Sequence, residues 1–327
     1  MFKQTAIQLF LLATFAAAHS AGAQQTERVY RIGYLSNRYM VEYREEALRQ
    51  GLKELGYVEG KNLVFEWRFT KGNRSRLDEL AAELVRSKVD CIVTSGTGSA
   101  RAAKKATSTI PIPVVIANLS DPVRAGIVTN LARPGGNITG FTTLSVGLAG
   151  KSLELLKDAV PQLSRVVLLV EQAHPNIPPV IEESQVAARK LGVRLQVVEV
   201  GRPDDFESAF RAARQWRADA IIVRGTGLMH KNRARITKLE AGTRLPVMYT
   251  ERRFVAAGGL MSYGMDRADP YRRAGAYIDK ILKGANPGDL PVQRPTKFDL
   301  VINMKTAEAI GISFPPSILL RATELIE

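Results

Sequence analysis

The fold is decided by a stretch that occurs twice, VDCIVTSGTG at residues 89–98 and ADAIIVRGTG at residues 218–227. Each copy places an Asp before a short apolar run and ends in Gly-Thr-Gly. An apolar run of this length that ends in glycines predicts a buried strand meeting a tight turn, because glycine accepts a positive φ there. The chain therefore contains the same strand-turn unit twice.

The segments around the two copies repeat in the same order. A strand, a helix, a second strand and a second helix precede each copy, and a helix and a proline-led strand follow it. The first and last strands of these patterns are residues 30–35 and 112–116 in the first half, and 165–170 and 245–249 in the second. Alternating strands and helices predict parallel sheets covered by helices. We predict an α/β fold with two similar Rossmann-like lobes.

Residues 1–23 have the features of a secretory signal peptide. Lys3 is the one cation, an apolar run covers residues 6–18, and Ala21-Gly22-Ala23 ends the segment. The apolar run is too short to span a bilayer, and a small-residue A-x-A ending is typical of signal peptidase sites. We expect cleavage after Ala23 and export to the periplasm. An uncleaved anchor helix is the alternative.

The size and cysteine content fit this expectation. About 300 mature residues suit two lobes of about 150 residues each. Cys91 is the only cysteine of the chain, so no internal disulfide can form. It lies inside an apolar strand, which predicts a buried structural thiol.

The chain is basic, with a formal net charge of +14. Such an excess raises the possibility of a polyanionic partner. The basic residues are, however, spread among acidic ones on helix surfaces, as in Arg211, Arg214 and Arg217. Since no helix-turn-helix or aromatic RNA-binding motif accompanies them, we predict a solvated basic surface and no nucleic-acid partner.

The motifs of common enzymes are missing from the sequence. His174 and His230 remain after the signal peptide, and neither has a second His or Cys at metal-ligand spacing. There is no nucleophile elbow and no phosphate-binding loop. Gly96-Thr97-Gly98 is followed by Arg101, where a dinucleotide fingerprint has Gly or Ala. We expect no catalytic residues, no metal and no cofactor.

Polar loops follow the predicted strands. The carboxyl ends of parallel strands lie at one edge, and open α/β sheets bind ligands in the crevice outside that edge. We expect a small polar organic molecule there, with a carboxylate at the start of the helix after Gly96 and a cationic end near Asp121 and Glu251. The candidate ligand contacts are Ser36, Asn37, Ser95, Gly96, Thr97, Asp121, Asn176, Arg224, Gly225, Tyr249 and Glu251.

Some of these residues have a simpler explanation. An Asp before Pro122 is common at the start of a turn, so Asp121 could be structural. Ser95 or Thr97 could cap the following helix. The group converging on one crevice is a stronger prediction than any one member.

Five segments resemble the ABC-transporter substrate-binding proteins related to the tryptophan- and tyrosine-binding ones: GLKELGYVEGKN (51–62), DPV (121–123), LARPGGNITG (131–140), AGGLMSYG (257–264) and LPVQRPTKF (290–298). The resemblance implies a type I periplasmic binding protein fold, with two lobes joined by three crossings. It also implies that the protein delivers its ligand to an ABC permease. The ligand contacts that it carries over are Ser95, Gly96, Thr97, Asp121, Asn176, Tyr249 and Glu251.

The chain departs from the family pattern at two places, Arg38 in a short first loop and Arg224 after the second-lobe strand. Relatives often have small polar residues near the first position and a small or acidic residue at the second. Both changes add positive charge to the predicted rim. They favour a more acidic ligand over an aromatic amino acid, and the sequence leaves the identity of the ligand open.

The expected crossings lie near residues 141–143 and 251–253 and after Pro287. They give a first lobe of residues 28–141 and 253–290 and a second lobe of residues 142–252 and 291–327. We expect the tail after Pro316 to end in a helix packed on the second lobe. The protein is expected to be a monomer.

Two other functions stay open at this stage. A ligand-sensing regulator of the same lobe type needs an amino-terminal DNA-binding helix pair, whereas here the signal peptide runs almost directly into the first strand. A secreted two-lobe enzyme needs an acid-base pair in the cleft, which only Asp121, Glu171, Glu251 and His174 could supply.

Overall fold

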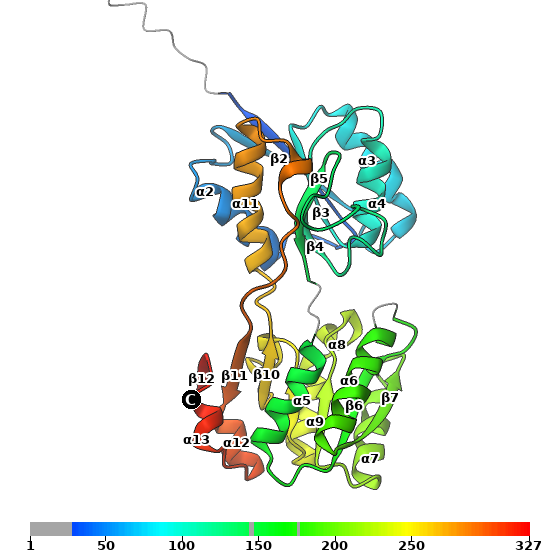
Figure 1. Cartoon of the computed structure of the whole chain (residues 1–327), viewed down its shortest axis with the longest axis vertical. Coiled ribbons are helices and arrows are strands. Elements are labelled where there is room, and N and C mark those ends of the chain that lie inside the picture. Colours follow the sequence, from blue (N-terminus) through cyan, green and yellow to red (C-terminus); the bar gives the residue numbers. More distant parts are fainter. Residues whose placement is uncertain (1–27, 144–146, 175–176) are drawn as a thin grey trace, which may run out of the picture.

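The protein has two α/β lobes, one above the other in Figure 1. The computed structural model describes residues 28–143, 147–174 and 177–327. The predicted signal peptide and Asn176 lie outside the described residues. One lobe has a five-stranded sheet with the order β2-β1-β3-β4-β5, and the other has a seven-stranded sheet with the order β12-β11-β10-β9-β8-β6-β7. The predicted fold class is confirmed.

The first lobe alternates strands and helices along most of its length. Its elements are β1 (Tyr30–Ser36), α2 (Tyr43–Lys53), β2 (Leu63–Phe69), η1 (Arg74–Arg76), α3 (Leu77–Arg86), β3 (Cys91–Ser95), α4 (Thr97–Ala106), β4 (Val114–Leu119), β5 (Ile138–Thr142), α11 (Asp269–Leu282) and η2 (Pro287–Asp289).

The second lobe continues the alternation and then adds the tail. Its elements are α5 (Leu148–Ala159), β6 (Arg165–Glu171), α6 (Ile177–Leu191), β7 (Arg194–Val200), α7 (Asp205–Gln215), β8 (Ala220–Val223), α8 (Gly227–Lys231), α9 (Arg233–Thr243), β9 (Val247–Tyr249), α10 (Arg252–Val255), β10 (Met261–Gly264), β11 (Asp299–Asn303), α12 (Met304–Ile310), α13 (Pro316–Leu319) and β12 (Glu324–Ile326).

Both sheets are buried on two faces. In the first lobe all neighbouring strands are parallel. Ile92 of β3 packs with Leu80 of α3 on one face, and Val93 packs with Leu48 of α2 on the other. This is why the strands are continuous apolar runs and not alternating ones. No helix in the described ranges is long and apolar enough to cross a membrane.

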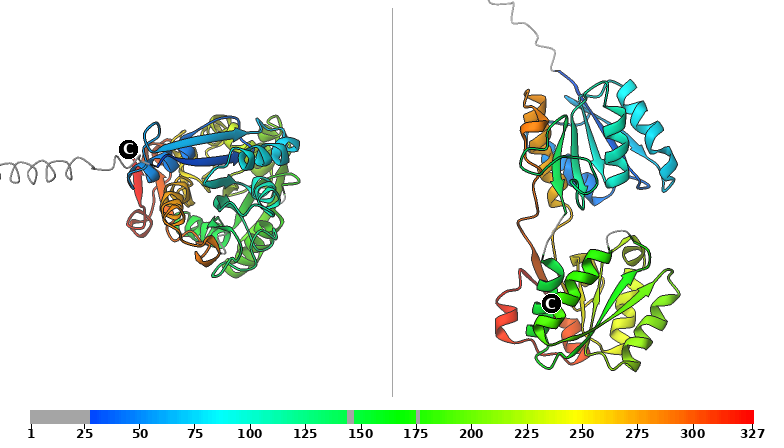
Figure 2. Two further views of the ribbon diagram at one scale, coloured as in Figure 1. Left: turned by 90° about the horizontal axis from the view of Figure 1, so that it is seen from above. Right: turned by 45° about the vertical axis from the view of Figure 1, so that its right-hand side comes forward.

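The path of the chain shows that the carboxyl edge of each sheet faces the other lobe. β5 ends at Thr142 and the chain then enters the second lobe, so the carboxyl edge of the first sheet faces that lobe. β10 ends at Gly264 and the chain then returns to α11, so the parallel strands of the second sheet end toward the first lobe. The right-hand view of Figure 2 shows the two lobes joined by a few connecting segments. Loops at the carboxyl edges of the two lobes therefore face one another.

The predicted lobe boundaries are wrong at two crossings. β10 pairs with β9 and β11 in the second sheet, so residues 253–264 belong to the second lobe and the crossing is at 265–268. Gln293 bridges to Phe141 of the first lobe, so residues 291–293, expected in the second lobe, lie with the first, and the third crossing is at 294–298. The tail ends in strand β12, parallel to β11, and not in a helix. These pairings join residues far apart in the chain, and local patterns do not reveal them.

Helix α11 returns to the first lobe and packs closely on α2. A Cβ on Gly275 would lie 2.7 Å from the carbonyl carbon of Gly51, and a Cβ on Gly51 would lie 2.0 Å from the backbone oxygen of Arg272. Backbone atoms cannot move aside as side chains can. The two glycines are therefore required for the contact that holds α11 in the first lobe.

We predict that Gly275→Ala destabilises the protein by about 1–3 kcal/mol, because the added methyl group overpacks this contact. Gly242→Ala is the matched control, since Gly242 lies in α9 and a Cβ there would have nothing within 4 Å. That change should stabilise the protein by up to about 1 kcal/mol through helix propensity. Urea unfolding of the two variants measures both effects, and equal effects would contradict the packing argument.

Candidate functional site

The candidate site lies at the two facing sheet edges. Ser36 and Ser95 end neighbouring strands β1 and β3, where they are partners in the sheet register. Arg224 and Glu251 follow β8 and β9 in the other lobe, and these two strands are also neighbours. The structure thus brings most of the predicted residues to the two edges, as the strand-turn pattern indicates.

The first-lobe edge offers hydrogen-bonding groups without partners. The Ser36 side chain is buried, with 1% exposure, and its Oγ has no hydrogen bond among the described residues. Gly96 has φ 91° and immediately precedes α4, which has no side-chain cap. The first backbone N–H groups of such a helix are free to bind an anion.

Ser95 and Thr97 differ in their surroundings. The Ser95 Oγ is 2.6 Å from the hydroxyl of Tyr271, a fully buried residue of α11. Thr97 is exposed at the first position of α4. Neither side chain caps α4, so the simpler explanation of a helix cap does not apply in this arrangement.

Arg38 is already paired. Its guanidinium contacts the carboxylate of Glu42 and lies 3.5 Å from Glu45 Oε1. Glu45 is fully buried and also accepts a hydrogen bond of 2.6 Å from the Tyr34 hydroxyl. The positive charge of Arg38 therefore orders the loop before α2, and its side chain has no free carboxylate-binding role here.

Asp121 and Asn37 also have local partners. Asp121 Oδ1 accepts from the backbone N–H groups of Val123, at 3.2 Å, and Arg124, at 3.0 Å. This is the turn-opening geometry expected of an Asp before Pro. Asn37 Oδ1 accepts from the Thr70 hydroxyl. Both residues lie at the first-lobe edge and shape its loops.

The second-lobe edge is centred on the buried carboxylate of Glu251, which is 4% exposed. Its Oε1 lies 2.8 Å from His230 Nε2 and is paired with Arg267 of the second crossing. Burial opposes ionisation, but Arg267, His230 and the more distant Arg44 outweigh it and hold the pKa of Glu251 below its usual value. Glu251 is an anion already paired with Arg267.

Arg224 has no such partner. Among the described residues its guanidinium makes no ion pair, although its backbone N–H donates to Leu169 at 3.0 Å. Burial, and then the like charge of Arg267, lower the pKa of Arg224 to about 10. The next residue, Gly225, donates its N–H to the Thr250 hydroxyl at 2.9 Å, which fixes the turn after β8.

Tyr249 lies in a different place from the other predicted residues. It is fully buried in the second-lobe core, stacked on Phe254, and its hydroxyl donates to Glu240 at 2.7 Å. Glu240 is also fully buried and accepts from the backbone N–H groups of Val247 and Leu260. The Tyr249 side chain holds the end of β9 in place and has no described contact at the cleft edge.

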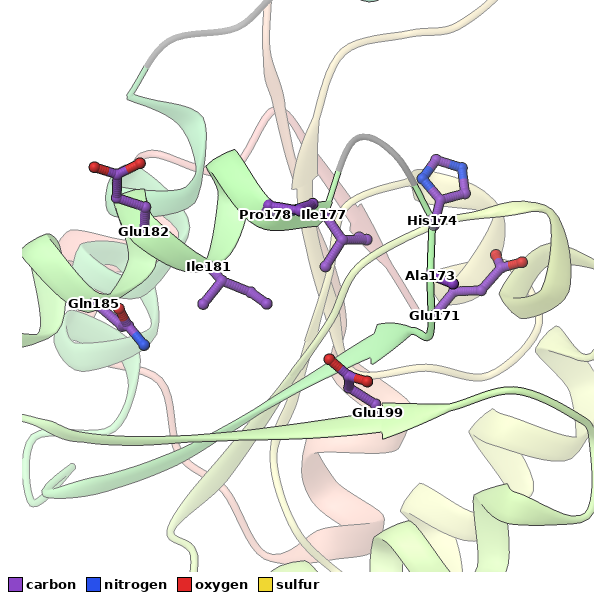
Figure 3. A pocket seen from close by; sticks show the side chains of 9 residues that line it. All are labelled: Glu171, Ala173, His174, Ile177, Pro178, Ile181, Glu182, Gln185 and Glu199. Carbon is purple, nitrogen blue, oxygen red and sulfur yellow. The ribbon is translucent and has the colours of Figure 1, made fainter.

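A separate hollow of about 530 Å³ lies in the second lobe beside α6 (Figure 3). Its lining includes Glu171, Glu182, Glu199 and His174 and contains no Lys or Arg. An acidic lining of this kind disfavours an anionic ligand. The hollow thus has no cationic side chain of the kind that Arg224 provides.

The structure supplies no candidate for metal or thiol chemistry in the described ranges. No group of three or more His, Cys, Asp or Glu side chains there could hold a metal ion. Cys91 is fully buried, and burial raises the pKa of its thiol to about 12. This agrees with the structural role expected for Cys91.

Sequence reasoning missed Arg267, Arg44 and His230 as members of the charged cluster. Arg267 lies in a crossing whose position the sequence did not reveal, and Arg44 lies at the start of α2 in the other lobe. His230 stands in the sequence without any signal that a carboxylate faces it. The net charge of +14 indicated an excess of cationic residues, but it did not indicate where in the fold they lie.

The fold and site together define a two-lobed binding protein of the type I periplasmic class. A family model described as ABC transporter substrate binding protein matches residues 39–326. The chain belongs to that family, as its sequence motifs predicted. The family consists of substrate-binding proteins and not of enzymes.

Two similar proteins are described with an amino-acid ligand, and a third is described without one. A curated tyrosine-binding protein of Clostridioides difficile is 26% identical over 264 residues, covering 80% of this chain and 75% of the relative. A Streptococcus pneumoniae structure in complex with L-Trp is 26% identical, covers 91% of this chain and 100% of that chain, and has a TM-score of 0.77. A conserved domain protein from Vibrio cholerae is 28% identical, with a TM-score of 0.77 and coverage of 91% and 99%.

More distant structures share the fold alone. The branched-chain amino acid binding protein of Streptococcus pneumoniae, solved with isoleucine, is 15% identical with a TM-score of 0.59. The match covers 80% of this chain and 86% of that chain. The type I fold is therefore shared well beyond the sequences that match closely.

We predict that protein stability falls as the pH rises from about 4.5 to 8, because burial raises the pKa of Glu240 from its ordinary value of 4.5 to about 8. When the pKa of a group is higher in the folded state than in the unfolded state, its contribution to stability is complete below the unfolded-state pKa. That contribution is lost as the pH rises from the unfolded-state pKa through the folded-state pKa. Glu240→Gln should flatten this part of the profile. Thermal melts at several pH values test it.

Glu251 supplies an internal comparison for that experiment. Its pKa is lowered, so its contribution is present above its ordinary value of 4.5 and is lost as the pH falls further. The two carboxyl groups therefore act in different pH windows. An unchanged slope above pH 4.5 in Glu240→Gln would contradict the assignment.

Proposed function

We propose that this protein is an exported solute-binding protein that closes its two lobes on a small polar organic ligand, an amino acid or related carboxylate, and delivers it to an ABC permease. Family membership and the amino-acid ligands of the relatives support the ligand class. The signal-peptide pattern of residues 1–23 supports export to the periplasm. The protein acts as a monomer and performs no catalysis.

The observation that carries this proposal is the buried, unpaired hydroxyl at the first-lobe edge. A buried hydroxyl without a partner costs free energy in the unliganded protein, about 1–3 kcal/mol. Ser36 Oγ is such a group, and it lies beside Ser95 near the open start of α4. A ligand carboxylate at this place would satisfy the hydroxyl and the free backbone N–H groups together.

The lobes also have the connections that closure needs. Separate sheets form the two lobes, and connecting segments of chain run between them. Side chains of the two lobes meet in cation-π contacts, where Arg253 lies 4.6 Å from the ring centre of Tyr43 and Lys231 lies 5.7 Å from that of Tyr39. Cation-π contacts at exposed sites are weak enough to exchange as the lobes rotate.

We predict that Ser36→Ala weakens ligand binding about tenfold or more while leaving the melting temperature unchanged or higher. The ligand loses a charge-assisted hydrogen bond, whereas the unliganded protein loses only an unsatisfied buried hydroxyl. Titration calorimetry with a ligand found by thermal-shift screening, beside melts of the ligand-free variant, measures both.

Ser108→Ala is the matched control, since Ser108 lies just past the opposite end of α4 and bonds the Lys105 backbone oxygen at 2.9 Å. Its binding should equal that of the wild type. Unchanged affinity in Ser36→Ala would remove the first-lobe edge from the binding site. A lower melting temperature with unchanged affinity would make Ser36 purely structural.

A further inference from the structure

The strongest unexplained feature of the second-lobe edge is the charge imbalance around Arg224. Arg224 lies directly after β8, on the same sheet face as Ile222, whose neighbours include residues of α5. Arg267 of the second crossing is close enough to lower the pKa of Arg224. Two cationic side chains therefore lie near each other where the chain passes between lobes.

Two carboxylates lie within electrostatic range of Arg224, those of Glu251 and Glu183. Glu251 is paired with Arg267 and lies 2.8 Å from His230. Glu183 Oε1 accepts from the backbone N–H groups of Ala149, at 3.2 Å, and Gly150, at 3.4 Å, at the start of α5. Neither carboxylate forms an ion pair with Arg224 in the described chain.

This arrangement changes the chemistry expected of the second-lobe edge. Glu251 is already paired with Arg267, so it is not free to bind a ligand ammonium group. A guanidinium that is half-buried and unpaired, in contrast, favours a planar carboxylate, which it can bind through two parallel hydrogen bonds. The first-lobe edge, with its helix start and unpaired hydroxyl, suits an anion as well.

We infer that the ligand is a small dicarboxylate, with one carboxylate at the start of α4 and the other on Arg224. This inference rests on the proposed function and specifies its ligand. It departs from the neutral amino acids bound by the similar tyrosine-binding and L-Trp-bound proteins. The acidic hollow beside α6 is not the place for such a ligand.

The test uses pairs of compounds that differ in one charge. Succinate is compared with succinamate and L-glutamate with L-glutamine, because each amide keeps the size of its partner and removes one carboxylate. L-tyrosine and L-tryptophan complete the panel. Thermal shift and titration calorimetry are run on the full mature chain, on Arg224→Gln and on the control variant Arg211→Gln. Arg211 is exposed on α7.

We expect at least one compound with two carboxylates to bind the wild type about 10- to 100-fold more tightly than its amide, the effect of one charged hydrogen-bonding interaction. Arg224→Gln should abolish this preference and leave the affinity for the amide unchanged. Arg211→Gln should bind like the wild type. Melts of the ligand-free variants show that each is folded.

Other outcomes overturn the inference in distinguishable ways. If a compound with one carboxylate binds and those with two do not, the dicarboxylate inference fails and the proposed function stands. If a compound with two carboxylates binds with equal affinity to wild type and Arg224→Gln, its second carboxylate is not on Arg224 and the inference fails. If no member of the panel binds the wild type, the inference fails, and the proposed function is then tested by the wider thermal-shift screen.

Discussion

Glu251 is buried at the end of β9, with Arg267 of the second crossing and His230 of α8 against its carboxylate. An uncompensated carboxylate at 4% exposure would be strongly destabilising, so Arg267 is required for the fold of this edge. The same pairing attaches the second crossing to the second lobe. It also removes Glu251 as a partner for a ligand, whereas the guanidinium of Arg224 has no ion pair among the described residues.

The two edges of the cleft are consequently unlike each other, although the lobes repeat one plan. The first edge presents the start of α4 and the buried hydroxyl of Ser36. The second presents a guanidinium in place of a helix start, because the short α8 begins only after Thr226. One lobe thus offers backbone dipoles and the other a full charge, and a ligand between them has two distinct ends.

The repeat VDCIVTSGTG and ADAIIVRGTG was enough to predict two parallel α/β lobes, because buried strand-turn units have a local signature. It also placed Ser95, Gly96 and Arg224 at strand ends. Side-chain pairing could not be predicted in the same way. The pairs of Arg38 with Glu45, and of Arg267 with Glu251, depend on which loops meet in space. The position of β10 depended likewise on its antiparallel pairing with distant β11.

The central claim is that the lobes close on a ligand held by both edges. Small-angle X-ray scattering of the mature protein measures this most directly, without ligand and with a saturating amount of a compound whose binding calorimetry has shown. The account predicts a smaller radius of gyration in the liganded protein, because hinge closure brings the two lobes together. An unchanged radius with proven binding would contradict it.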